Sequence, residues 1–201
     1  MTSTRTTAVL LLTAVVLMIA AAALAVPSGL TLNPADPTAT LAAVRSNVGL
    51  HLTELALDVL GWLALTAAAL TLRPRLPAGL LACAGLAGLL HDAGNLAVTQ
   101  LTNPEIAAAI LLTAKWMVNL AGLLWVAATA AATRQLPLPP ALRRAGMAVV
   151  VPGLAAVVLP WTTGTVGPSP ALEQLGYALH LPVLAWYCAL AGHLYRARLT
   201  A

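Results

Sequence analysis

The sequence predicts an all-α protein that crosses a lipid bilayer six times. Hydrophobic residues make up 60% of the 201 positions, charged residues make up 8%, and the mean hydropathy is +0.90. Soluble domains carry about 25% charged residues, so this chain has too much apolar surface for a soluble globule. Its apolar residues also fall into six runs, each near the length of about 20 residues that a spanning helix needs. We therefore expect a single transmembrane domain over residues 1–201.

Short segments rich in proline and glycine separate the six predicted spans. Asn103 and Pro104 are a typical helix start, because Asn caps a helix N-terminus and Pro fits its first position. Ser169 and Pro170 repeat this pattern before the last span. The prolines of "QLPLPPALRR" predict a loop over residues 135–144. The spans are expected at residues 8–26, 49–72, 78–100, 105–133, 145–161 and 171–195.

The first span has a second interpretation as a cleaved signal peptide, because "ALAVPS" offers small residues at its end. Its apolar run is long for a signal peptide and only Arg5 precedes it, so we expect it to stay in the protein. In the segment that follows, "TATLAAVRSNV" predicts a short helix along the membrane interface.

The basic residues predict the orientation, because cytoplasmic loops of membrane proteins are enriched in Lys and Arg. With the N-terminus inside, only Arg45 lies in an outer loop and Lys115 lies within a span. A chain rich in Ala, Leu and Arg with one Lys indicates a high-GC bacterial genome. We expect a multi-pass protein of the bacterial cytoplasmic membrane with both termini inside. The arginines on the inner side are Arg5, Arg73, Arg75, Arg134, Arg143, Arg144, Arg196 and Arg198.

Polar residues within the spans gather in the outer half of the membrane. Asp58, His91, Lys115 and His180 lie on four different spans, each about nine or ten residues, or about 14 Å, from its outer end. Inner halves such as "GWLALTAAALTL" hold almost nothing ionisable. Because lipid penalises charged side chains, we expect these groups to face one another in a single pocket.

Helical spacing adds further residues to the same faces, since side chains three, four or seven positions apart lie side by side. Asp92 lies off the stripe of His91 and is expected to face another helix or a water, and Glu173 is expected at the rim. The candidate catalytic residues are Asp58, His91, Lys115, His180 and Glu54. The candidate substrate-binding residues are Asn95, Asn119, Tyr177, His51 and Trp116.

We favour a membrane-embedded enzyme that acts on a lipid-like or isoprenoid substrate. Carboxylates and imidazoles in a half-buried pocket are suited to general acid–base catalysis, and the surrounding Leu and Trp residues favour an amphiphilic substrate. In this interpretation Lys115 holds Asp58 ionised, and Glu54 exchanges protons with His91. No HExxH or GxSxG motif is present in the sequence to name the reaction.

Other interpretations stay open. A haem or a divalent metal is the first, with His91, His180 and His51 as candidate ligands, although Lys115 at the same depth disfavours a cation. A transporter or channel for a small solute is the second, but it would also need polar lining in the inner half. A sensor or assembly partner hinged at Pro182 is the third. Polar side chains can also simply hold helices together, at about 0.6 kcal/mol each.

Asp58, Asn119 and His180 follow one another at a constant interval of 61 positions, as three tandem helix hairpins would give.

Cys83 and Cys188 form no CxxC motif and are expected to be buried core residues. The net charge of +4 is explained by the inner arginines, so no nucleic-acid partner is expected. The expected partners are the lipid bilayer and an amphiphilic small molecule, and an oligomer stays open.

Overall fold

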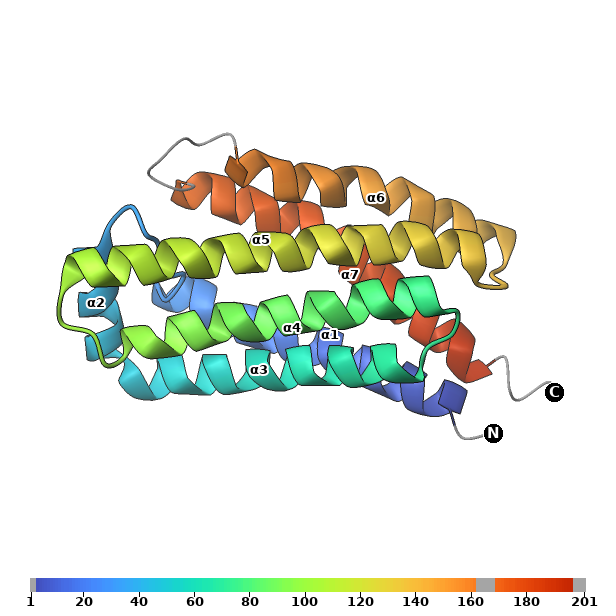
Figure 1. Ribbon diagram of the computed structural model, residues 1–201, viewed down its shortest axis with the longest axis horizontal. Helices are drawn as coiled ribbons and strands as arrows, with labels where there is room; N and C mark the ends of the chain where they lie inside the picture. The colour runs from blue at the N-terminus through green and yellow to red at the C-terminus, as the bar shows by residue number, and fades with distance from the viewer. Residues whose placement is uncertain (1–2, 162–168, 197–201) are drawn as a thin grey trace.

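The computed structural model describes residues 3–161 and 169–196, and all regular secondary structure within them is helical (Figure 1). Six of the helices are long and apolar enough to cross a membrane, which confirms the predicted six-span fold and indicates a multi-pass membrane protein. A short helix, α2 (Pro37–Ser46), lies between the first two of them. The spanning helices are α1 (Ser3–Ser28), α3 (Val48–Thr71), α4 (Arg75–Val98), α5 (Pro104–Gln135), α6 (Pro140–Trp161) and α7 (Pro170–Arg196).

The spanning helices form a closed ring whose order follows the chain. Each packs against the next, and α7 returns to α1 to close the ring. The helices α3, α5 and α7 therefore occupy alternate positions and run in the same direction (Figure 1). Asp58, Asn119 and His180 lie on these three helices. This arrangement is the one expected of three hairpin repeats, and the repeat itself stays a prediction.

Helix starts follow the predicted capping pattern. The side-chain oxygen of Asn103 accepts hydrogen bonds from the backbone N–H groups of Glu105 and Ile106, at 2.8 and 3.3 Å. The hydroxyl of Ser169 accepts one from the backbone N–H of Leu172 at 3.4 Å. These contacts satisfy N–H groups that have no partner within the first turn of a helix.

The structure corrects one predicted boundary. The segment 135–144 was expected to be a loop, but α6 begins at Pro140, so Arg143 and Arg144 are helical. Proline lacks an N–H group and has a fixed φ, and both properties suit the first position of a helix. The short helix predicted after the first span is confirmed as α2, with Asp36 as its N-cap.

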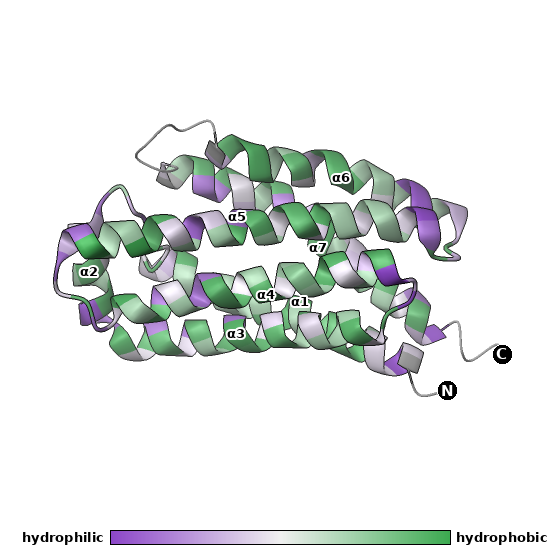
Figure 2. Ribbon diagram, in the orientation of Figure 1, coloured by the Kyte–Doolittle hydropathy of each residue, from purple (hydrophilic) through white to green (hydrophobic). Residues whose placement is uncertain are grey.

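The two ends of the ring differ in charge. The start of α1 and the end of α7 lie at one end, here named the inner end, and α2 lies at the other, the outer end (Figure 1). Hydrophilic residues gather at both ends in Figure 2, but the arginines of the α3–α4 and α5–α6 connections fall at the inner end. The Arg5 guanidinium lies 5.3 Å from the centre of the Tyr195 ring, which joins α1 to α7 there. The positive-inside rule makes this the expected cytoplasmic end.

The outward surface of the ring is apolar. Leu70 and Val151 expose 79% and 71% of their surfaces, which a bilayer accommodates because lipid tails are as apolar as leucine. Cys83, expected in the core, is instead exposed on α4, and Cys188 is half-buried. Hydrophobicity cannot separate the two positions in a spanning helix, since the inward and outward faces are both apolar.

Two apolar clusters fill the ring at different depths. The larger cluster extends from the inner end to the middle, where the Trp125 ring packs edge-on against Trp62 and Tyr187, with centroids 5.7 and 5.5 Å apart. The smaller cluster lies at the outer end, beneath α2, and joins it to α1, α4 and α5. Its members are Ala25, Leu30, Leu32, Leu41, Val44, Val98, Ala107 and Leu111.

Candidate functional site

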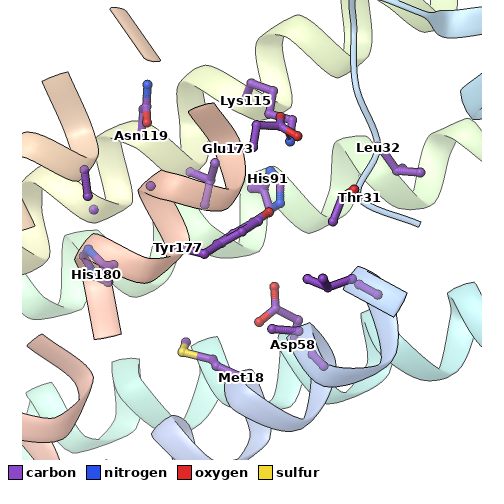
Figure 3. Close-up of a pocket in the computed structure, with 18 of the residues that line it drawn as sticks. Met18, Thr31, Leu32, Asp58, His91, Lys115, Asn119, Glu173, Tyr177 and His180 are labelled. Atoms are coloured by element: carbon purple, nitrogen blue, oxygen red, sulfur yellow. Dashed lines mark ion pairs between the residues drawn. The ribbon is translucent and has the colours of Figure 1, made fainter. Parts of the chain in front are cut away.

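A cavity of about 510 Å³ lies between the two apolar clusters, in the outer half of the ring (Figure 3). All six spanning helices and the segment after α1 contribute to its wall. Its volume is within the range of about 300–1,000 Å³ that is typical of small-molecule sites. Nine of the ten predicted site residues line it, namely Glu54, Asp58, His91, Asn95, Lys115, Trp116, Asn119, Tyr177 and His180.

The polar and the apolar residues that line the cavity come mainly from different helices, here called its polar wall and its apolar wall, although α7 of the polar wall stands between α1 and α6 in the ring. The polar wall comes from α3, α4, α5 and α7, and Figure 3 shows Asp58 and Tyr177 directed into the space from two of these helices. The apolar wall comes from α1, α6 and the segment after α1, and Trp62 and Trp125 close the inner end. A cavity with two such walls matches a molecule that has a polar head and an apolar body.

The cavity also opens toward the side of the ring. Ile19 and Val26 on α1 and Leu181 on α7 line it, yet they expose 46%, 39% and 54% of their surfaces. The buried contacts between α1 and α7 lie nearer the inner end, in the larger apolar cluster. The outer halves of α1 and α7 therefore carry cavity-lining side chains that are also exposed.

Lys115 forms an ion pair with Glu173, which joins α5 to α7. The two side chains expose only 12% and 5% of their surfaces. The sequence had predicted that Lys115 pairs with Asp58, and the structure differs because α7 brings Glu173 to the ammonium group. Asp58 instead accepts a hydrogen bond at 3.2 Å from the indole N–H of Trp62, one turn along α3.

His51 is the predicted site residue that does not line the cavity. Its ring is fully buried, with Nε2 3.3 Å from the backbone oxygen of Asn95 and Nδ1 3.2 Å from the Glu54 carboxylate. A carbonyl oxygen only accepts hydrogen bonds, so Nε2 carries a hydrogen. The contact at Nδ1 then needs a second proton, held either by the imidazole or by Glu54. This geometry lets His51 and Glu54 share a proton beside the cavity, which Glu54 lines.

His91 is held by hydrogen bonds at both ring nitrogens. Nδ1 lies 2.9 Å from the backbone oxygen of Ala114 and must donate to it, so Nε2 accepts from the Asn95 amide at 3.0 Å. The sequence had predicted proton exchange between His91 and Glu54. The structure pairs Glu54 with His51 instead, because both lie on α3 one turn apart.

Asp92 joins the site although it lies off the stripe of His91. It exposes only 1% of its surface, and one ligand atom each from Asp58, His91 and Asp92 lie within 4.8 Å of one another. It faces α3, in line with the expectation that it faces another helix. Gly88, one turn earlier on the same face, is so close to α3 that an added Cβ would overlap the Trp62 ring. Small residues typically mark such helix contacts. Gly88 could therefore have shown from the sequence that the face of α4 carrying Asp92 packs against another helix.

The three histidines proposed as metal ligands do not belong to one group of three or more ligating side chains within the described residues. His180 lines the cavity with its ring packed edge-on against Trp125, at a centroid distance of 5.6 Å. Within residues 3–161 and 169–196, the group of ligating side chains close enough to share an ion contains His91 but neither His180 nor His51.

No protein-family model, curated protein or solved structure matches this chain.

Proposed function

We propose that this protein is a membrane-embedded enzyme that binds a lipid-like or isoprenoid molecule in the cavity and transfers protons at its polar head. The observation that carries the proposal is the His51–Glu54 pair. Its geometry lets the two side chains share a proton at the polar wall, and Glu54 lines the cavity. A group that can gain or lose a proton beside bound substrate is the requirement for general acid–base catalysis.

The two walls support an amphiphilic substrate. The apolar body would lie against α1 and α6, where Met18, Ala22 and Val157 line the cavity. The head would meet the polar wall, where the Lys115–Glu173 pair offers both a cation and an anion. The lateral opening would admit a molecule directly from the bilayer, so no passage through water is needed.

Each polar group has a proposed role. Glu54 is the proton donor or acceptor, and His51 is a positioning residue that shares its proton. Lys115, whose charge is balanced by Glu173, keeps further N–H groups that can donate hydrogen bonds to the head group. Further contacts to the head group come from Asn95, Asn119, Tyr177 and His180, and Trp116 flanks the apolar body.

The packing of the inner half favours an enzyme over a transporter or channel. The Trp125 ring packs edge-on against Trp62 and Tyr187 on the inner side of the cavity. A transport pathway would have to pass through these rings to reach the inner end. Polar lining on both sides is what such a pathway requires. The proposed location is the cytoplasmic membrane of a bacterium, with the cavity in the outer half of the bilayer.

The test compares wild-type protein with Glu54→Gln in liposomes made from a total bacterial lipid extract. Untargeted mass spectrometry of the lipids should show masses that are consumed and formed by the wild type and unchanged by Glu54→Gln. Native mass spectrometry in mild detergent should show the same retained amphiphile in both, because Gln keeps the shape of the side chain.

Glu105→Gln is the matched control, because Glu105 is exposed at the start of α5 and does not line the cavity. It should leave the conversion intact. If wild type and Glu54→Gln give identical lipid profiles while both retain the amphiphile, the protein binds such a molecule but is not an acid–base enzyme. If neither retains an amphiphile, the proposed substrate class is wrong.

A further inference from the structure

We propose that Asp58, His91 and Asp92 hold a divalent metal ion of the zinc class at the polar wall of the cavity. The three residues come from the adjacent helices α3 and α4, and one ligand atom from each lies within 4.8 Å of the other two. A single ion about 2.0–2.2 Å from each ligand atom could contact all three after small side-chain movements. The site does not depend on the identity of the amphiphile and goes beyond the proposed function.

The strongest indication is the surroundings of Asp92. Its side chain exposes 1% of its surface, and no N–H group or hydroxyl in the described part of the chain donates a hydrogen bond to either carboxylate oxygen. The group that faces it is a second carboxylate, Asp58. Two buried carboxyl groups side by side need either a shared proton or a cation between them, because an uncompensated buried charge costs several kcal/mol.

Lys115 does not supply that charge, since it is paired with Glu173. The same pairing removes the objection that a lysine at this depth disfavours a cation, because Glu173 neutralises the ammonium group. A divalent ion would balance the negative charges of the two carboxylates, and the imidazole ligand is neutral. The site would then be neutral inside the bilayer, where net charge is most costly.

Neighbouring hydrogen bonds orient two of the three ligands. The Nδ1–H group of His91 donates to the backbone oxygen of Ala114 at 2.9 Å, which leaves the lone pair on Nε2. Metal-binding histidines typically donate their other ring N–H to a carbonyl or carboxylate in this way. Trp62 holds one oxygen of Asp58 at 3.2 Å and leaves the other oxygen for the ion. The Asn95 amide, now at Nε2, would turn away when the metal binds.

The ligand types select the class of metal. One imidazole nitrogen and two carboxylates suit zinc or a similar transition ion, whereas Ca²⁺ prefers six to eight oxygens and Mg²⁺ an octahedral shell with several waters. Zinc in enzymes typically keeps three protein ligands and one open position. Asp58 and His91 line the cavity, so the open position would face a bound molecule, where a metal can polarise an oxygen or activate water.

The test uses the full-length protein in mild detergent, stripped with a chelator and titrated with Zn²⁺ against a chromophoric competitor. Wild type should bind one Zn²⁺ per chain. Asp92→Asn should weaken binding by about 100-fold or more, since even outer-shell partners of metal ligands are worth about 10–100-fold. Co²⁺ added in place of Zn²⁺ should give visible absorption bands with wild type that Asp92→Asn lacks.

Asp36→Asn and His193→Ala are the matched controls, because both residues lie outside the cavity lining, and they should bind Zn²⁺ like wild type. His180→Ala should also retain the ion. Thermal unfolding checks that Asp92→Asn is folded, and Asp58→Asn replaces it if it is not. The proposal is overturned if wild type binds no more Zn²⁺ than Asp92→Asn or Asp58→Asn, because the two carboxyl groups then share a proton. It is also overturned if His180→Ala is the one variant that loses the ion.

Native mass spectrometry of the same samples separates this proposal from the proposed function. An amphiphile retained by protein that binds no Zn²⁺ would overturn only the metal site. Zn²⁺ bound by protein that retains no amphiphile would leave the metal site standing and overturn the substrate class.

Discussion

The inner and outer halves of the ring are built from the same helices but are filled in different ways. In the inner half, the Trp125 ring packs edge-on against Trp62 and Tyr187. Alanine-rich helix faces pack closely around these rings. In the outer half, the same helices enclose a cavity of about 510 Å³ with ionisable groups along one wall. The inner half therefore supplies packing, and the outer half holds polar side chains that would be unfavourable in contact with lipid.

Packing in the inner half should make the largest contribution to stability. Trp125→Ala removes ring contacts with Trp62, His180 and Tyr187 at once. Truncating a buried aromatic residue costs about 3–5 kcal/mol, and we expect a loss of that size in chemical or thermal unfolding. Trp116→Ala, on the same helix but 42% exposed, should cost much less. Equal losses for the two variants would mean that the inner half is not the better-packed region.

The polar wall should be sensitive to unbalanced charge. Lys115→Met leaves Glu173 buried without its ionic partner, and breaking a buried pair costs about 3 kcal/mol or more. The double variant Lys115→Met with Glu173→Gln removes both charges and should recover most of the stability. If the double variant is as unstable as the single one, the loss comes from packing and the ion pair does not stabilise the wall.

The contact between α3 and α4 should tolerate little extra volume. Gly88→Ala places a methyl group against the Trp62 ring, and overpacking of this kind costs about 1–3 kcal/mol. Gly79→Ala is the matched control, because nothing lies within 4 Å of an added Cβ there. It should be neutral or slightly stabilising, since alanine favours helix by about 1 kcal/mol over glycine. A thermal unfolding experiment in which both variants behave alike would contradict the close packing.

The apolar wall should affect binding more than stability. Ala22→Phe projects a large ring into the cavity from α1, and we expect about tenfold weaker retention of the amphiphile, or about 1.4 kcal/mol. Ala56→Phe, at an exposed position on α3 outside the cavity lining, adds the same group and should have no effect on retention. Quantitative lipid analysis of the purified variants measures the difference. Unchanged retention in Ala22→Phe would place the ligand elsewhere.

The fold and the position of the cavity could be predicted from the sequence, but the pairing of its side chains could not. Hydropathy and proline positions predict the spans, and polar residues at a common depth predict a common pocket. Helical spacing, however, says which residues share a face and not which neighbour that face meets. For this reason the partners of Lys115 and Glu54, and the burial of His51 and Asp92, became clear only when the helices were placed in the ring.

The most direct test of the central claim is photolabelling with a lipid that carries a diazirine in its acyl chain. Labelled residues would be located by mass spectrometry, with and without an excess of unlabelled bacterial lipid. We predict that labelling of the cavity wall around Ala22 and Leu181 is saturable and competed, whereas labelling of the lipid-facing Leu70 is not. Equal, uncompeted labelling at all three positions would contradict the claim that the outer half contains an amphiphile-binding cavity.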